Sequence, residues 1–190
     1  MRIYRVLSPI ASVILLATVA ACAGGGEDSS GGDSGAYWQT NCGSDAAPVG
    51  VTSASGQAIS NSVTVLDDPV PVVFVVEEAP PAQNLVTEEL RSGDGATVQI
   101  DDLITVDYCG VSMSSGALFD SSWLRGEPAT FPLSQGALIQ GWVDGIPGMQ
   151  VGERRVLIIP GDLAYGSNPP PGIEPNETLI FVVELRQIVS

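Results

Sequence analysis

Hydrophobic and polar residues alternate along the C-terminal half of the chain, which predicts antiparallel β-strands. In the segment 103–111, Tyr108 shares one face with Ile104 and Val106, and Cys109 lies on the other face. Further strands are expected at 85–90, 153–160 and 178–189. In the last of these strands, one face carries Leu179, Phe181, Val183 and Leu185.

Between positions 138 and 149 the apolar residues recur at helical spacing, which predicts one short amphipathic helix. These residues are Leu138, Ile139, Trp142, Val143, Ile146 and Met149. Glycines and a proline interrupt the segment and weaken such a helix by about 1–3 kcal/mol each. Gly141 directly precedes Trp142, so the tryptophan is either a plain core residue or a ring that a ligand approaches closely. A sheet with a single helix predicts the α+β class.

The segment 37–83 forms a separate N-terminal extension in this interpretation. It contains Cys42 and two β-prone runs, at 61–66 and 70–76, which the sequence DDPVP separates with a turn. The sequence EEAPPAQ at 77–83 interrupts the chain again, and we expect the boundary of the C-terminal domain, residues 84–190, at this point.

The N-terminus has the features of a bacterial lipoprotein signal. Residues 1–21 combine Arg2 and Arg5 with an apolar run of about 11 residues, too short to span a bilayer. The sequence VAAC that ends at Cys22 resembles a lipobox, in which the cysteine is lipidated; an ordinary signal with an incidental cysteine is the alternative. The Gly- and Ser-rich segment 22–36 is expected to be a flexible tether. The protein is therefore expected to be extracytoplasmic and lipid-anchored to the bacterial cell membrane.

Composition narrows the possible functions. The formal net charge is −15, and the seven basic residues are all arginine, with no lysine or histidine. Nucleic-acid phosphates would repel such a chain. The sequence also lacks the histidines that most often act as general bases and metal ligands, and it shows no cluster of metal ligands or phosphate-binding loop. We expect no cofactor, no metal ion and no nucleic-acid partner.

Six motifs of the C-terminal half resemble, in order, those of FKBP-type peptidyl-prolyl cis-trans isomerases. They are LFDSSW (118–123), FPL (131–133), LIQGWVDGIPGMQVGERR (138–155), LAYG (163–166), PPGI (170–173) and TLIFVVEL (178–185). The resemblance implies a bent antiparallel sheet wrapped on one short helix, with an apolar aromatic pocket between them. It also implies isomerisation of X–Pro bonds in unfolded or exported polypeptides, and macrolide-type inhibitors as possible ligands.

The resemblance assigns roles to individual residues of the pocket. It implies that Trp142 is the pocket floor, that Gly141 keeps bulk away from this floor, and that Arg125 pairs with a carboxylate at 120. The implied catalytic residues are Tyr108, Asp120 and Tyr165. The implied substrate-binding residues are Phe119, Arg125, Phe131, Leu138, Ile139, Trp142, Ile173 and Phe181. Two positions depart from the family pattern: Ala129 replaces an aromatic and predicts a shallower wall, and Asp101 replaces a turn glycine.

Two other functions stay open from the sequence. One is an FKBP-like chaperone or peptide-binding module with little isomerase activity, which Ala129 would favour. The other is a solute-binding or wall-structural lipoprotein, although the chain shows neither repeats nor two lobes.

Cys42 and Cys109 are a pair of cysteines that the family resemblance does not explain. Disulfides persist in exported proteins, and Cys109 faces away from the pocket because its neighbour Tyr108 faces into it. Ile180 and Val182 would give this outer face an apolar surface that needs a cover. We therefore expect that the extension packs on the outer face and that a Cys42–Cys109 disulfide fastens it; two free thiols are the alternative.

Overall fold

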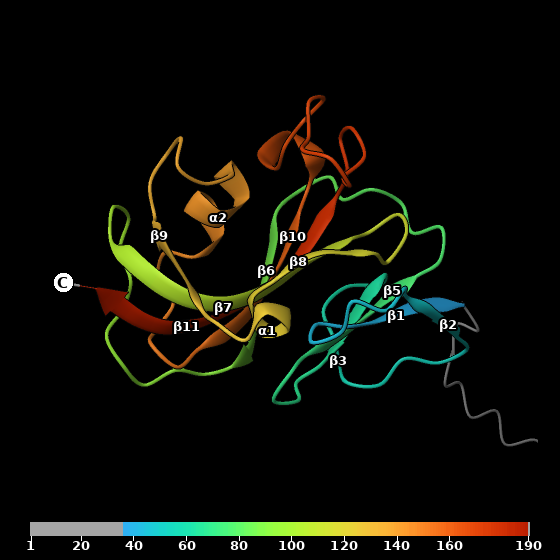
Figure 1. The fold of residues 1–190 in the computed structure, drawn as a ribbon, viewed down its shortest axis with the longest axis horizontal. Helices are drawn as coiled ribbons and strands as arrows, with labels where there is room; N and C mark the ends of the chain where they lie inside the picture. The colour runs from blue at the N-terminus through green and yellow to red at the C-terminus, as the bar shows by residue number, and fades with distance from the viewer. Residues whose placement is uncertain (1–35, 190) are drawn as a thin grey trace, which may run out of the picture. The chain divides into compact units, whose positions relative to one another are not determined.

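A computed structural model describes residues 36–189 (Figure 1). The predicted signal peptide, the lipidation site Cys22 and all but the last residue of the predicted tether lie outside the described residues. Within the described part of the chain, no helix is long and apolar enough to cross a membrane.

The C-terminal half forms a six-stranded antiparallel sheet. Its strands are β6 (Val86–Arg91), β7 (Leu103–Ser112), β8 (Leu118–Ser121), β9 (Ala129–Pro132), β10 (Arg154–Ile159) and β11 (Leu179–Val189). They are ordered β6-β10-β11-β7-β8, and β9 also pairs with β7. The four strands expected from alternation are all present. Asp101 adopts a φ of 70°, the left-handed region that its place in a glycine-like turn led us to expect.

One face of this sheet carries the main core. Tyr108, Ile104 and Val106 of β7 lie in it, as do Leu179, Phe181, Val183 and Leu185 of β11. Helix α2 (Gln140–Gly145) adds Trp142 to the same core, and Ile146 follows directly after the helix. The predicted two-faced alternation is therefore confirmed, and the fold is of the α+β type that the sequence indicated.

The helices differ in two ways from the prediction. Helix α2 has six residues rather than the whole segment 138–149, because Pro147 has no N–H to donate and Gly148 turns to a φ of 87°. A second helix, α1 (Ser122–Arg125), was not predicted. It is a single turn, capped by the Ser121 hydroxyl at its start and by Gly126, at a φ of 74°, at its end.

The glycine before Trp142 serves packing against the sheet. A Cβ atom at Gly141 would lie 2.4 Å from Cγ2 of Ile159, on strand β10. The absence of a side chain therefore lets α2 approach β10 closely. The expectation that Gly141 clears the pocket floor is wrong, because the space that it leaves is filled by Ile159 rather than open to a ligand.

The N-terminal extension forms a second antiparallel sheet, which Figure 1 colours blue to green. Its strands are β1 (Tyr37–Asn41), β2 (Val49–Val51), β3 (Gln57–Ala58), β4 (Val63–Leu66) and β5 (Val72–Val76), in the order β2-β1-β5-β4-β3. The two β-prone runs became β4 and β5. Strands β1, β2 and β3 were not predicted, because β1 combines two aromatic residues with three polar ones, and β2 and β3 have only three and two residues.

A second core joins the two sheets. The outer face of the C-terminal sheet contributes Cys109, Val111, Val156, Ile158, Ile180 and Val182. The extension contributes Cys42, Ile59, Val63, Val65, Val73 and Val75. A disulfide joins Cys42 and Cys109, whose Cα atoms are 5.7 Å apart. The extension thus covers the apolar outer face, as the unusual exposure of Ile180 and Val182 on an isolated domain led us to expect.

Arg154 forms ion pairs that link the two sheets beside this second core. Its side chain is only 2% exposed, and its guanidinium pairs with Glu184 and with Asp67 of the extension. It also donates to the Pro69 carbonyl oxygen at 3.2 Å, and it lies over the Trp123 ring. Burial alone would raise the pKa of Glu184, but hydrogen bonds from Arg154 and Arg186 outweigh it and hold the pKa below its ordinary value. The extension is therefore fixed by a disulfide at one point and a buried ion pair at another.

Candidate active site

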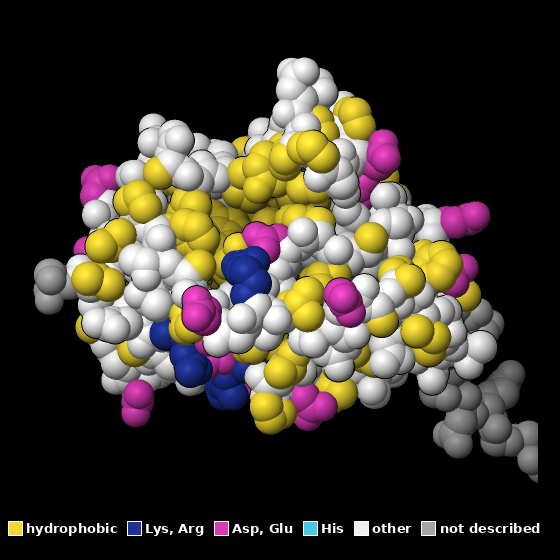
Figure 2. Space-filling view, viewed as in Figure 1, with side chains coloured by type: hydrophobic (Ala, Val, Ile, Leu, Met, Phe, Trp, Pro, Cys, Tyr) yellow, Lys and Arg dark blue, Asp and Glu magenta, His cyan; other side chains and the backbone are white. Residues whose placement is uncertain are grey.

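A hollow of about 560 Å³ lies on the inner face of the C-terminal sheet. Its lining residues come from β7, β8, β9 and β11, from α2 and the turn before it, and from the loop that follows the 3-10 turn η1 (Gly161–Leu163). Figure 2 shows it as a recess of hydrophobic side chains, with an arginine and an acidic side chain at its edge. Such a surface suits an apolar ligand group.

Aromatic rings form the base of this hollow. The Trp142 side chain is 3% exposed, and three rings meet it nearly at right angles, with centroid distances of 5.4 Å to Tyr108, 5.7 Å to Phe131 and 5.3 Å to Phe181. Phe119 in turn packs edge-on against Phe181, at 5.6 Å. Edge-to-face contacts at these distances are favourable and fix each ring relative to its neighbours. The base is therefore a set of mutually fixed rings, nearly free of polar groups.

A carboxylate stands at the rim and is held from two sides. Asp120, in β8, accepts hydrogen bonds from the Arg125 guanidinium and from the Tyr108 hydroxyl. Arg125 also donates to the Tyr108 oxygen, at 3.1 Å. Burial and the hydrogen bond to Asp120 raise the pKa of Tyr108 to about 12, so at neutral pH its hydroxyl is a donor. Asp120 is thus a fixed negative charge whose oxygens are already engaged.

Tyr165 lies on the other side of the opening. Burial, and then the nearby charge of Asp120, raise the pKa of its hydroxyl, which therefore stays protonated at neutral pH. Its side chain is partly exposed, and its hydroxyl makes no hydrogen bond to another described residue. This hydroxyl is available to donate to a bound peptide.

Comparison with known proteins decides the family. The model of the FKBP-type peptidyl-prolyl cis-trans isomerase family matches residues 95–186. The FK506-binding protein of Streptomyces anulatus is 48% identical over 108 residues, which are 56% of this chain and 86% of that protein. The chain belongs to the FKBP family. It is a peptidyl-prolyl cis-trans isomerase.

Other relatives agree with this FKBP assignment. A peptidyl-prolyl cis-trans isomerase of Saccharomyces cerevisiae is 48% identical over 90 residues, 47% of this chain and 67% of that protein. Among solved structures, FkpA from Escherichia coli matches with a TM-score of 0.51 and 40% identity, covering 55% of this chain and 48% of that one. An isomerase of Pseudomonas syringae matches with a TM-score of 0.51 and 29% identity, covering 59% and 80%.

The FKBP hollow brings together most of the residues that the resemblance implied. Those that line it are Tyr108, Phe119, Asp120, Phe131, Leu138, Ile139, Trp142, Tyr165 and Phe181. Arg125 lies at the rim, through its contacts with Asp120 and Tyr108. Ile173 is not among the lining residues; it packs beside the inner core, as does Ala129. The implied substrate contact through Ile173 and the shallower wall at Ala129 stay predictions.

Four lining residues were not predicted. They are Gly136, Ala137, Gln140 and Ala164. Each is adjacent in sequence, or nearly so, to a predicted residue. Gly136, Ala137 and Ala164 carry no chemical signal, and the Gln140 side chain donates instead to Asp144, so only the course of the backbone brings these residues to the opening.

The extension holds the strand that carries Asp120. The Thr40 hydroxyl donates to the Gly116 carbonyl oxygen at 2.5 Å, in the turn before β8, and the Ser121 hydroxyl donates to the Cys42 carbonyl oxygen at 2.6 Å. Ser121 also caps α1, the turn that presents Arg125. The N-terminal sheet therefore supports both partners of the rim ion pair from behind.

Proposed function

We propose that this FKBP catalyses X–Pro isomerisation in exported proteins, with the substrate proline ring lying on the indole of Trp142. The observation that carries the proposal is the rigid aromatic base, framed by a fixed carboxylate and an unengaged tyrosine hydroxyl. A pyrrolidine ring is compact and apolar, and its face can pack on such a base.

The chemistry requires no nucleophile. Rotation about the X–Pro bond crosses a barrier of about 18–20 kcal/mol because the twisted amide loses its resonance, and uncatalysed exchange takes roughly 10–100 s. A 10⁴-fold acceleration needs about 5.4 kcal/mol of preferential stabilisation of the twisted form. Water stabilises the planar amide more than the twisted one, since the planar form is more dipolar. Transfer into an apolar hollow removes this preference.

Two polar groups would add to this effect. The planar amide places partial negative charge on its carbonyl oxygen, and this charge shrinks as the bond twists. The Asp120 carboxylate, fixed by Arg125 and Tyr108, would disfavour the planar form of a carbonyl bound beside it. The Tyr165 hydroxyl would hold the peptide in place while the bond turns.

Tyr165→Phe tests this role. Without the hydroxyl we expect the fold to remain and kcat/KM for a proline tetrapeptide to fall about tenfold, the effect of one lost hydrogen bond of roughly 1–1.5 kcal/mol. Tyr37→Phe, in β1 and away from the hollow, is the matched control and should retain wild-type activity. If the wild type isomerises the peptide no faster than the uncatalysed rate but still binds unfolded chains, a chaperone or peptide-binding module is favoured instead.

The exported setting is the second part of the proposal. Removal of Arg2 and Arg5 with the signal peptide leaves five arginines against 22 acidic residues, so the mature chain cannot rely on charge to stay at an anionic membrane. Two or more acyl chains on Cys22 would anchor it, at about 0.8 kcal/mol per buried methylene. The substrates would then be exported polypeptides. Macrolides such as FK506, for which the Streptomyces relative is named, would compete with these substrates for the aromatic hollow.

Cys22→Ser tests the anchor. We expect the wild-type protein, expressed in a bacterial host with lipoprotein processing, to enter the detergent phase on phase partitioning, and the variant to stay in the aqueous phase. If both proteins stay in the aqueous phase, the lipoprotein interpretation is wrong.

A further inference from the structure

A second, smaller hollow of about 390 Å³ adjoins the aromatic one. We call it the side groove. One wall is the loop 45–48 of the extension, between β1 and β2, and the other wall is formed by β8 and α1. Phe119 and Asp120 line both the side groove and the aromatic hollow. The two hollows therefore share a border at β8.

The side groove is mainly apolar. Ala46 and Ala47 are exposed on one wall, and Pro48 is half-buried beside them. On the opposite wall Leu124 has 43% of its surface exposed, in the single-turn helix α1. The charged residues of the side groove are Asp45, Asp120 and Arg125, and Asp120 and Arg125 already form an ion pair with each other. An apolar side chain is the group that this lining suits best.

The extension wall is fixed in place before any ligand arrives. The disulfide at Cys42 and the hydrogen bond from Ser121 to the Cys42 carbonyl oxygen fasten the start of the loop. Asn41 and Ser44 then accept hydrogen bonds from the backbone N–H groups of Gly43 and Ala46, at 2.8 Å and 3.2 Å. A pre-formed wall reduces the ordering cost of binding.

We propose that the side groove is a specificity subsite for an apolar residue that flanks the proline of the substrate polypeptide. The inference rests on the proposed function of the aromatic hollow and adds a determinant that lies outside residues 95–186, the part that the FKBP family model matches. Substrate preference would then be set partly by the N-terminal extension.

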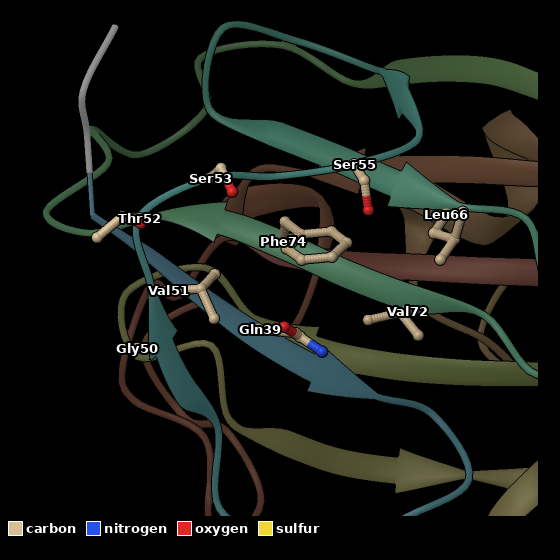
Figure 3. Close-up of a pocket in the computed structure, with 9 residues that line it drawn as sticks. All are labelled: Gln39, Gly50, Val51, Thr52, Ser53, Ser55, Leu66, Val72 and Phe74. Atoms are coloured by element: carbon tan, nitrogen blue, oxygen red, sulfur yellow. The ribbon is translucent and has the colours of Figure 1, made fainter. Parts of the chain in front are cut away.

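A third hollow, shown in Figure 3 with Gln39 and Phe74, lies on the other face of the N-terminal sheet and shares no residue with the aromatic hollow.

Kinetics with two substrates test the subsite. One substrate is a proline tetrapeptide, and the other is the same sequence extended on both sides by leucine residues. Ala47→Glu, at an exposed position, is expected to lower kcat/KM for the extended peptide about five- to tenfold and to leave the tetrapeptide unchanged. Ala58→Glu makes the same change at an exposed position in β3 and should alter neither value.

Two further readouts separate the possible failures. Replacing the flanking leucines of the peptide by serine should remove the effect of Ala47→Glu. Dissociation constants of the same peptides, measured by calorimetry, should follow the same pattern. Binding therefore tests the side groove even if the wild type isomerises neither peptide. Absence of isomerisation would overturn only the proposed function. Equal losses on both substrates, or no loss on either, would contradict the subsite.

Discussion

Trp142→Ala is expected to lower the free energy of unfolding by about 3–5 kcal/mol and to reduce isomerase activity close to background. The side chain is 3% exposed and packs against three other aromatic rings, so its removal leaves a cavity in the core and takes away the base of the hollow. Chemical denaturation and the tetrapeptide assay measure the two effects.

Two variants serve as controls for this result. Trp142→Phe keeps an aromatic ring and removes a buried indole N–H that has no hydrogen-bond partner among the described residues, so we expect a smaller loss of stability. Tyr165→Phe should change activity with little effect on stability. The double role of Trp142 is wrong if Trp142→Ala and Tyr165→Phe unfold at the same thermal midpoint.

Removal of the Cys42–Cys109 disulfide is the second large effect that we expect. The bond links residues 67 positions apart, and a closed loop of that length gives roughly 4 kcal/mol in the chain-entropy model. Both cysteines are fully buried in the core between the sheets. The double variant Cys42→Ala/Cys109→Ala should therefore unfold at a markedly lower denaturant concentration than the oxidised wild type.

Reductant provides the control for the disulfide. It should lower the unfolding midpoint of the wild type and leave that of the double variant unchanged. Thiol titration of the denatured, unreduced mature protein is expected to find no reactive thiol from this pair, whereas two reactive thiols per chain would end the hypothesis.

Local patterns predicted four of the six strands of the C-terminal sheet and its two faces, but not the short strands β8 and β9. Alternation placed Tyr108 and Cys109 on opposite faces, because side chains alternate strictly along a strand. The family resemblance then assigned the Tyr108 face to the pocket. The same logic at Ile180 and Val182 predicted an apolar outer face that requires a cover. The aromatic residues of the site came from a different source, the order of six motifs, since no periodicity distinguishes a pocket aromatic from a core aromatic.

Features that depend on distant partners were not predictable. Arg154 occupies a buried position because Asp67 and Pro69, more than 80 residues earlier, supply its partners. Strand β1 carries three polar residues, and the sequence does not show that one of them, Thr40, is buried and donates to the Gly116 carbonyl oxygen. The role of Gly141 was misassigned because only the structure shows Ile159 beside it.

The most direct test of the central claim is where the proline ring lies when a peptide is bound. Intermolecular nuclear Overhauser effects between an isotope-labelled proline peptide and the protein measure this. We expect contacts from the proline ring protons to the indole protons of Trp142 and the rings of Phe131 and Phe181. Contacts to Phe74 and Val72 in the hollow of Figure 3, with none to Trp142, would contradict the account.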